Sequence, residues 1–483
     1  MTRSPAVSAA AAIRSRLGGE PAKGEGCCVG CRLVLIQALL CLGGQAAIYH
    51  VSPQGNDAHP GTADQPFLTI GKGVATAEAG DSVWVQPGVY VEPQTKTVRG
   101  GTADARITFR AAGAVTNNGF LIAHSYITVD GFTMTGAPTG PFTGPIAIGP
   151  RASHVHIVNN LIHDLEKKIW GIYFQHGGNL PSQSAQSCLV SNNIIRNVPY
   201  NLLNVLGADH LICNNRLEVS GGDIFRVAGG NLVIRSNYVT RAGELPGGGH
   251  ADLWQSIAEG SDTATNILFE QNFFDTCNSQ ICQMESAFTN RTGRHLTVDI
   301  RDWTFRNNLF YRVNYQANLL VPDTKWYNNL FFQCTTNVGI VLACVLSPKS
   351  GRADNTRIFN NIFLGCGGRA SQLYTGNDPN HGWYAFEAGL TNCVADYNYV
   401  ANLNYSGKTR TSKPPFIWRE PHGVNGGIPD FVSVADKDFR LRPTSRLIDK
   451  GISLSGFTDD ITGSPRPVGA GWDIGPFEYQ GPR

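Results

Sequence analysis

Residues 211–217 read Leu-Ile-Cys-Asn-Asn-Arg-Leu, and this pattern of apolar residues around an Asn recurs along the chain. Related stretches lie at residues 155–162, 189–195, 233–239, 268–274, 304–310, 325–331 and 358–363. The last Asn of each stretch stands at position 160, 193, 215, 237, 272, 308, 329 or 361, which gives intervals of 33, 22, 22, 35, 36, 21 and 32 residues. An interval of 21–22 residues indicates one coil of a β-solenoid, and a longer interval indicates a coil with an inserted loop.

The residues beside each Asn alternate between apolar and polar, which is typical of short strands with one face in a core. A single coil cannot bury that face, so the coils must stack. We expect the recurring Asn at a sharp bend, because its short amide tolerates the left-handed conformation and can bond to the Asn of the next coil. The sequence therefore predicts an all-β parallel β-helix with a structural Asn ladder.

Cysteines follow the same spacing. Cys277, Cys334 and Cys366 each stand five residues after a repeated Asn, and Val198 and Val313 occupy the equivalent position in other coils. A position shared by Cys and Val is typical of a small buried side chain. We interpret these cysteines as core residues, and disulfide bonds between them stay possible.

The first 47 residues differ in character from the rest. Basic residues between 14 and 32 precede an apolar run at 33–42, and small residues follow at 43–47. This pattern predicts a secretory signal segment over residues 1–47, with a membrane anchor as the alternative. The run is short for a membrane span, and no later segment is long and apolar, so the mature chain is expected to be soluble and secreted, either extracellular or periplasmic. A formal charge of +2 without basic runs speaks against a nucleic-acid partner.

Both ends of the remaining chain resemble a known fold family. Residues 49–57 (Tyr-His-Val-Ser-Pro-Gln-Gly-Asn-Asp), 79–90 (Ala-Gly-Asp-Ser-Val-Trp-Val-Gln-Pro-Gly-Val-Tyr) and 473–478 (Asp-Ile-Gly-Pro-Phe-Glu) resemble right-handed parallel β-helix proteins of the pectate-lyase superfamily, some of which are polysaccharide lyases. The resemblance covers about residues 48–480. It implies the fold rather than one activity, because that superfamily contains lyases, glycoside hydrolases, epimerases and binding proteins.

The resemblance also implies the organisation of the chain. Residues 48–483 are expected to form a single domain with a short capping helix at 71–79. Within it we expect an N-terminal cap and first coils at 48–110, central coils at 111–400 and a C-terminal cap region at 401–483.

Counting forward from each repeated Asn defines two polar rows, at eight and eleven residues. The first row contains Lys168, Asn201, Asp223, Asp252 and Gln280, and the second contains Asn204, Arg226, Gln255 and Gln283. Two rows three residues apart cannot both point outward from an ideal strand. One row is therefore expected at a turn or bulge, and together the rows predict a polar wall along which a sugar chain can bind.

Asp223 and Asp252 are predicted to stack on neighbouring coils, about 4.8 Å apart. Carboxylates at that spacing repel each other unless a cation or a shared proton intervenes. With Asn201 and Gln280 they would form a Ca²⁺ site; alternatively, they are the paired acids of a retaining glycosidase. The simpler interpretation of Asp223 is a turn residue after two glycines.

His250 follows three glycines and precedes Asp252 by two residues. A histidine there can act as acid or base, with Asp252 orienting it or binding metal. Arg226 matches the planar geometry of a uronate carboxylate, and Lys168 is a second candidate base. Each has a plain alternative: a surface turn for His250, a bridge between coils for Arg226 and a solvated side chain for Lys168.

Further residues are predicted to contact the glycan because they share these rows or adjoin them in loops. They are Asn201, Asn204, Trp254, Gln255, Gln280, Gln283, Glu285 and His176. Long insertions at 243–251, 286–300 and 344–356 are expected to raise one side of the wall.

Three functions are compatible with this wall. The first is a polysaccharide lyase that cleaves a uronate-containing glycan by β-elimination, with His250 or Lys168 as base and Arg226, or Ca²⁺, neutralising the uronate. The second is a glycoside hydrolase that uses Asp223 and Asp252, or one of them with Glu285. The third is a non-catalytic glycan-binding surface protein.

Overall fold

The computed structural model describes most of the chain after the predicted signal segment. It covers residues 46–136, 144–166, 169–177, 181–246, 250–257, 263–289, 293–336, 341–368, 384–387, 389–401, 420–426 and 429–481. The signal segment predicted at 1–47 lies outside these ranges except for its last two residues. Residues 46–483 form one compact unit. Within the described ranges, no helix has the length and apolar character needed to cross a membrane.

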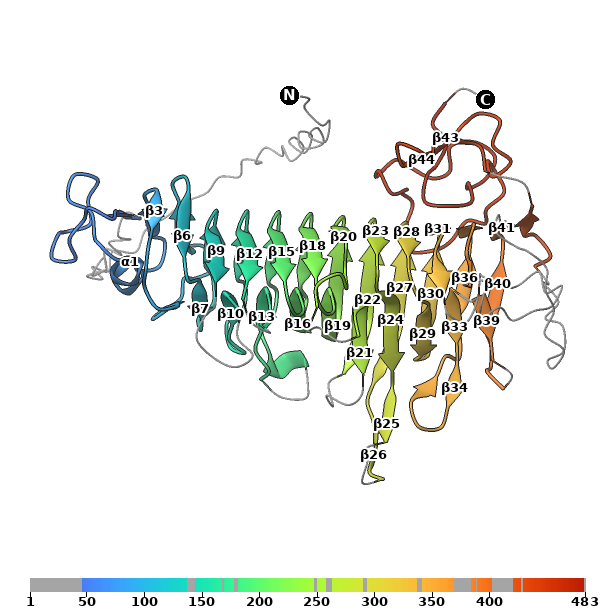
Figure 1. The fold of residues 1–483 in the computed structure, drawn as a ribbon, viewed down its shortest axis with the longest axis horizontal. Helices are drawn as coiled ribbons and strands as arrows, with labels where there is room; N and C mark the ends of the chain where they lie inside the picture. The colour runs from blue at the N-terminus through green and yellow to red at the C-terminus, as the bar shows by residue number, and fades with distance from the viewer. Residues whose placement is uncertain are drawn as a thin grey trace, which may run out of the picture. The chain divides into compact units, whose positions relative to one another are not determined.

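The chain folds as a right-handed parallel β-helix, as predicted (Figure 1). Each coil contributes strands to three parallel ladders. The first ladder contains β4 (Thr95–Lys96), β7 (Phe120–Ile122), β10 (Ile146–Ile148), β13 (Ile172–Phe174), β16 (Leu203–Ala208), β19 (Phe225–Arg235), β21 (Asp252–Ile257), β24 (Gln280–Glu285), β29 (Ala317–Leu320), β33 (Leu342–Cys344) and β39 (Tyr384–Phe386).

The second ladder shares the long strand β19 with the first, so the two form one sheet. It contains β1 (Ile48–Val51), β2 (Ser82–Val85), β5 (Ile107–Ala111), β8 (Ile127–Asp130), β11 (His156–Val158), β14 (Leu189–Ser191), β17 (Leu211–Cys213), β19, β22 (Ala264–Glu270), β27 (Ile300–Arg306), β30 (Thr324–Tyr327), β36 (Arg357–Phe359) and β40 (Val394–Asp396).

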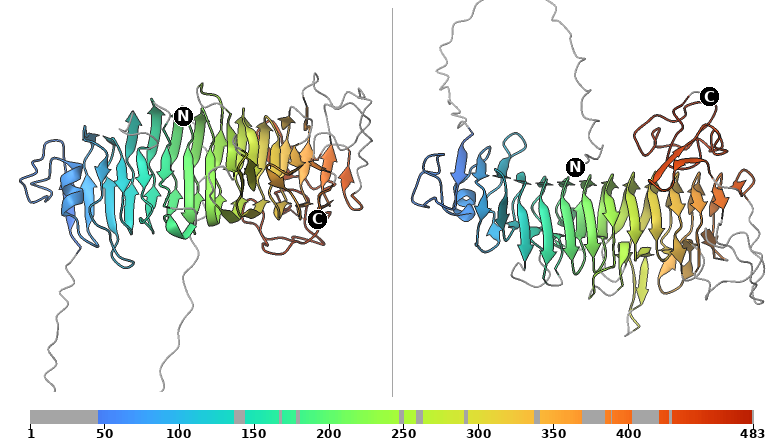
Figure 2. Two further views of the ribbon diagram at one scale, coloured as in Figure 1. Left: turned by 90° about the horizontal axis from the view of Figure 1, so that it is seen from below. Right: turned by 45° about the horizontal axis from the view of Figure 1, so that its top comes forward.

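The third ladder forms a separate sheet. It contains β3 (Gly88–Val89), β6 (Val115–Asn117), β9 (Thr133–Gly136), β12 (Leu161–Leu165), β15 (Ile194–Val198), β18 (Arg216–Ser220), β20 (Tyr238–Thr240), β23 (Phe273–Cys277), β28 (Leu309–Val313), β31 (Leu330–Phe332), β37 (Ile362–Leu364), β41 (Tyr399–Ala401) and β42 (Val424–Asn425). In both views of Figure 2 the strands of successive coils lie side by side.

Four short pairs lie outside the ladders. They are β25 (Ala287–Thr289) with β26 (His295–Thr297), β32 (Thr335–Thr336) with β38 (Gly367–Gly368), β34 (Leu346–Ser347) with β35 (Gly351–Arg352), and β43 (Phe431–Ser433) with β44 (Asp438–Leu441). A 3-10 turn, η1, spans Pro181–Gln183.

The predicted Asn ladder runs inside the solenoid. Asn215, for example, donates its side-chain amide to Asn237 Oδ1 at 3.0 Å and to the carbonyl oxygen of Val190 at 2.9 Å. The ladder ends where Asn398 donates to Glu420 Oε1 at 2.9 Å. Each amide is fully bonded, so the row satisfies its buried polar groups without water.

One detail of the Asn prediction is wrong. The left-handed residue is the one before the ladder Asn: Asn192 and Asn214 have φ of 58° and 56°, whereas the ladder residues Asn193 and Asn215 have no positive φ. A turn residue directs its side chain outward, so the chain divides the two tasks between neighbours. The first residue makes the bend, and the second directs its amide inward.

The core is filled by rows of equal side chains. Phe274, Phe310, Phe331 and Phe363 stack with ring centroids 4.7–4.9 Å apart. The cysteines predicted as core residues are buried and free. Stacking like on like gives every coil the same dimensions, which keeps the ladders in register.

A helix covers the N-terminal end of the solenoid. Helix α1 (Ile70–Thr76) confirms the predicted capping helix, although it begins and ends earlier than 71–79. It starts at Thr69, whose side chain accepts a hydrogen bond from Lys72 N at 3.1 Å, and it buries Ile70 and Val74 against the first coils. The C-terminal segment with β43 and β44 lies beside the coils and packs on the outer face of the third ladder, where Lys437 Nζ bonds Asp275 Oδ2 at 2.6 Å (Figure 1).

Candidate active site

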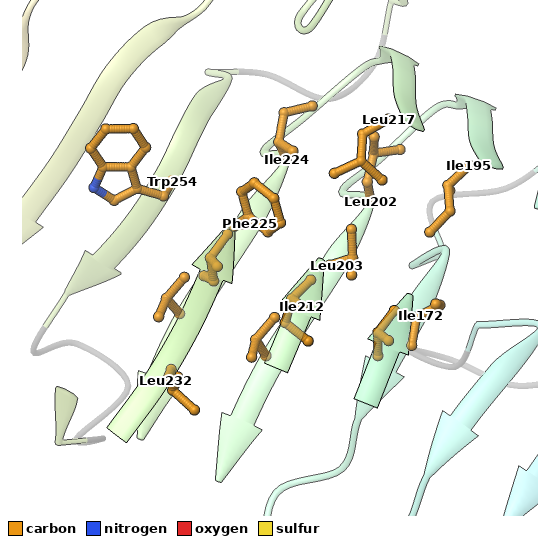
Figure 3. Close-up of a cluster of buried hydrophobic side chains, with 14 of the residues drawn as sticks. Ile172, Ile195, Leu202, Leu203, Ile212, Leu217, Ile224, Phe225, Leu232 and Trp254 are labelled. Carbon is orange, nitrogen blue, oxygen red and sulfur yellow. The ribbon is translucent and has the colours of Figure 1, made fainter. Parts of the chain in front are cut away.

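Both predicted polar rows lie on one wall because two consecutive residues between them point inward. Leu202 and Leu203, Ile224 and Phe225, and Leu253 and Trp254 are all fully buried, and Figure 3 shows several of these side chains together in the core. A strictly alternating strand would place only one residue of each pair inside. The extra inward residue interrupts the alternation at the start of the first-ladder strand, so residues i and i+3 lie side by side on the same side of the coil. The first-row side chains are nevertheless buried, namely Asn201, Asp223, Asp252 and Gln280.

The sheet register confirms the predicted alignment of the central coils. Asn204 pairs with Arg226, Arg226 with Gln255, and Gln255 with Gln283. Asp252 pairs with Gln280. The row continues to Asn318, opposite Gln283.

The prediction fails one coil earlier. Tyr173 pairs with Asn204, and Gly171 N donates to Asn201 O at 3.2 Å, so this register aligns Trp170, and not Lys168, with Asn201. That coil has two more residues between the ladder Asn and the first-ladder strand than the next coil, and counting from the Asn missed them. Lys168 itself lies outside the described residues.

The two aspartates are stacked and buried. Asp223 Oδ1 accepts a hydrogen bond from Asp252 N at 2.9 Å, and Asp223 N donates to Asn201 Oδ1 at 2.7 Å. Exposed fractions are 4% for Asp223 and 0% for Asp252, and Asp252 Oδ1 has no hydrogen-bond partner. Burial, followed by repulsion from Asp252, raises the pKa of Asp223 to about 7. Burial likewise raises the pKa of Asp252 above its ordinary value.

His250 covers Asp252 from the solvent side. Its Nδ1 is 3.4 Å from Asp252 Oδ2, and its Nε2 is 2.9 Å from Gln280 Oε1. The Gln280 amide nitrogen donates to Cys282 O and to Gln283 Oε1, so its oxygen faces the imidazole. With an acceptor at each ring nitrogen, His250 is held as an imidazolium. The hydrogen bond with Asp252 is the largest factor that raises its pKa, to about 9.

Arg226 completes the network. Its Nη1 is 3.7 Å from Asp223 Oδ2 and donates a short hydrogen bond to Gln255 Oε1. Gln255 in turn donates to Asp252 Oδ2 at 2.9 Å. The side chains of His250 and Arg226 are 60% and 35% exposed. Two buried carboxyl groups therefore hold two cations at the surface.

The described residues do not fit the predicted Ca²⁺ site. Calcium needs six to eight oxygen ligands with a net negative charge. Here His250 and Arg226 already supply positive charge to Asp223 and Asp252, and the Asn201 oxygen is used by a backbone amide. In the described part of the chain, no three His, Cys, Asp or Glu side chains form a group that could hold a metal ion.

The other predicted contact residues differ in their surroundings. Trp254 is 0% exposed and packs 4.8 Å from the ring of Phe305, so the prediction that it contacts a glycan is wrong; the second inward position of its coil places it in the core. Asn204 is nearly buried and donates to Phe174 O at 3.0 Å. Glu285 accepts from Gln283 at the end of β24. His176 is exposed, two coils from Arg226.

Sequence reasoning missed Tyr173 and Asn318, which extend the second row in both directions. A count of eleven from the ladder Asn could not find them, because Tyr173 stands 13 residues after Asn160 and Asn318 stands ten after Asn308. The residues before them, Gly171-Ile172 and Gln316-Ala317, lack the apolar pair that marks the neighbouring coils, so no sequence signal placed them.

Comparisons with known proteins agree with this fold. A family model described as a protein of unknown function (DUF1565) matches residues 53–98, which include α1. The crystal structure of the pectate lyase Pel9A is 16% identical and has a TM-score of 0.52, with 91% of this chain and 98% of that chain covered. A structure of XylC with xylose is 15% identical and has the same TM-score, with 89% and 98% covered. No curated protein matches the sequence. The similarity shows that the chain has the parallel β-helix fold.

Proposed function

We propose that this protein is a secreted carbohydrate-active enzyme that cleaves a uronate-containing glycan by β-elimination. The observation that carries the proposal is the pair of exposed cations, His250 and Arg226, held on one wall of the solenoid by two buried carboxyl groups. The fold shared with a pectate lyase supports it. An anionic sugar is the substrate class that such a wall would attract.

In this mechanism Arg226 binds the uronate carboxylate. Its planar guanidinium matches that group, and neutralising the carboxylate makes the C5 proton more acidic. His250 is the base: in its neutral form it takes the C5 proton, and the electrons of that C–H bond form the C4–C5 double bond. The C4–O bond breaks, and the protonated His250 passes its proton to the leaving oxygen, which departs as a hydroxyl group. Because the pKa of His250 is about 9, the neutral form grows as the pH rises, so activity should increase towards pH 9.

Exposure favours elimination over hydrolysis. A glycoside hydrolase needs both carboxyl groups in contact with the scissile bond or its water, and Asp252 is fully buried beneath His250. Hydrolysis is the second candidate because a carboxyl group with a pKa of about 7, as in Asp223, suits a general acid. The two reactions differ in their products.

The test is a screen of the mature protein, starting near Ala47, against alginate, polygalacturonate, hyaluronan, chondroitin and neutral glycans. Elimination gives products with the ultraviolet absorbance of a C4–C5 double bond, and His250→Ala and Arg226→Ala should each lower the rate at least 100-fold. The matched control is His163→Ala, because His163 also contacts an aspartate, Asp164, at 2.6 Å, but on the third ladder.

Other outcomes would contradict the proposal. Saturated reducing sugars as products would assign hydrolysis. Binding without any cleavage, with His250→Ala binding as well as the unchanged protein, would make the wall a glycan-binding surface.

A further inference from the structure

The wall is built from side-chain pairs that we call rungs, each made by residues i and i+3 of one coil. Asp223 and Arg226 approach to 3.7 Å, Asp252 and Gln255 to 2.9 Å, and Gln280 and Gln283 also to 2.9 Å. In each of these three coils, the first residue of the rung stands directly before the inward apolar pair and the second stands directly after it. The same two positions can therefore be followed from coil to coil.

Two coils before the Asp223–Arg226 rung, the rung is aromatic. The register aligns Trp170 with Asn201 and pairs Tyr173 with Asn204. The rings of Trp170 and Tyr173 lie 5.8 Å apart and are tilted by 34°. Tyr200, from the next coil, packs edge-on against Trp170 at 5.5 Å and 77°.

These rings are not needed to fill the core. Ile172 and Phe174 of the same coil are fully buried and point inward. Trp170 is 8% exposed and lies beneath its neighbours, whereas Tyr173 and Tyr200 are half-buried at the surface. At the two positions that carry amides, acids or a guanidinium in the coils that follow, this coil has Trp170 and Tyr173, and Tyr200 of the next coil completes an aromatic cluster.

We propose that Trp170, Tyr173 and Tyr200 form a sugar-binding subsite on the same wall as Arg226. Aromatic faces bind the apolar C–H faces of pyranose rings, while the phenol oxygens can bond to hydroxyl groups. The occupant is another sugar of the glycan whose uronate binds Arg226. This inference rests on the proposed function for the nature of the glycan, and on the register for the position.

The spacing gives the subsite a length requirement. Two coils separate the aromatic rung from Arg226, which is about 10 Å at the usual distance between strands. An oligosaccharide spans that distance, whereas a single sugar does not. The subsite therefore strengthens the binding of long chains and leaves short ones unaffected.

The experiment compares Tyr173→Ala with the unchanged protein on polymeric substrate and on short oligosaccharides of the same glycan. Removal of one stacking face should raise KM for the polymer about tenfold, with the effect on KM rather than on kcat. Short fragments should show no change in KM. Tyr173→Phe keeps the ring and should lose less than Tyr173→Ala. The matched control is Tyr327→Ala, because Tyr327 belongs to an aromatic pair with Phe359 on the second ladder.

A binding measurement separates this inference from the proposed reaction. The His250→Ala protein, with and without Tyr173→Ala, is run by affinity electrophoresis in gels that contain polygalacturonate, alginate, hyaluronan or chondroitin. Retardation that depends on Tyr173 supports the subsite even if no variant ever cleaves a glycan, in which case only the elimination reaction falls. Equal retardation of both proteins, or an equal rise of KM for short and long substrates, would overturn the subsite while cleavage stands.

Discussion

Replacing Asp223 by Asn should make this protein more stable at neutral and alkaline pH. Asp223 is 4% exposed, and its pKa is raised to about 7, first by burial and then by Asp252. The amide has the same shape, and its Oδ1 can still accept the hydrogen bond from Asp252 N that Asp223 accepts at 2.9 Å. The substitution therefore removes a costly charge and keeps the local backbone contact.

The size of the effect follows from the shift in pKa. The carboxyl group titrates at 3.8 when unperturbed and at about 7 in the folded protein, and each unit corresponds to about 1.4 kcal/mol. Ionising Asp223 in the folded state thus costs about 4 kcal/mol above pH 7. The sign is that of a raised pKa: the stability is fully present below pH 3.8 and is lost as the pH rises through 7. The attraction of Arg226, 3.7 Å away, is already part of this pKa, so the expected gain above pH 7 stays at about 4 kcal/mol.

The assay is urea unfolding of both proteins between pH 4 and pH 9, followed by tryptophan fluorescence. The gain should be near zero at pH 4, grow up to pH 7 and stay constant above it. Asp275→Asn is the matched control, because bonds to Lys437 and Tyr238 lower the pKa of Asp275 despite its burial. That variant should be less stable than the parent at neutral pH. Equal stability of Asp223→Asn and the parent at pH 8, or a gain of the same size at pH 4, would refute the reasoning.

Three further predictions concern the same structure. Asp252→Asn should lower the pKa of His250 from about 9 to near its ordinary 6.5, because Asp252 is the main cause of the shift; NMR titration of the imidazole measures this, and an unchanged pKa would contradict it. Asn215→Ala should destabilise the solenoid by about 3 kcal/mol, because it leaves the backbone N–H of Asn193 and the carbonyl oxygen of Val190 without their partners. A loss below about 1 kcal/mol in urea unfolding would show that the Asn ladder contributes little to stability. Chelation with EDTA should change neither the rate nor the melting temperature, because His250 and Arg226 already supply the positive charge; a loss that added Ca²⁺ restores would reverse that conclusion.

The fold was predictable because its energetics repeat. Each coil must bury the same kinds of side chain at the same places, so a spacing of 21–22 residues, an Asn and a following Cys or Val are visible without coordinates. The stacked phenylalanines and the buried Cys277 follow the same rule. Because the requirement for burial recurs in every coil, the residues that meet it recur at the same spacing in the sequence.

The wall was predictable where the coils keep the same length or where an insertion is visible in the sequence. Asp223, Arg226, Asp252 and Gln255 were aligned correctly because a visible insertion was allowed for in one coil. In the coil of Trp170, two inserted residues shifted the count from the ladder Asn, and the repeat pattern gave no sign of them. Trp254 was misplaced for a different reason: the second inward residue of a coil breaks the alternation by which strand faces are read from sequence.

The aspartate pair departs from the rule by which the rest of the solenoid is built. Elsewhere the coils stack like on like with groups that tolerate it, namely amides on amides and rings on rings. Stacked carboxylates repel, and burial adds to that cost. Two neutral amides would fill the same positions without penalty, as Asn201 does one coil earlier. A purely structural role therefore does not account for Asp223 and Asp252. Placing His250 and Arg226 side by side requires negative charge beneath them, and by raising the pKa of His250 to about 9 that charge makes its neutral imidazole a stronger base. That requirement is the physical link between the cost in stability and the proposed chemistry of the wall.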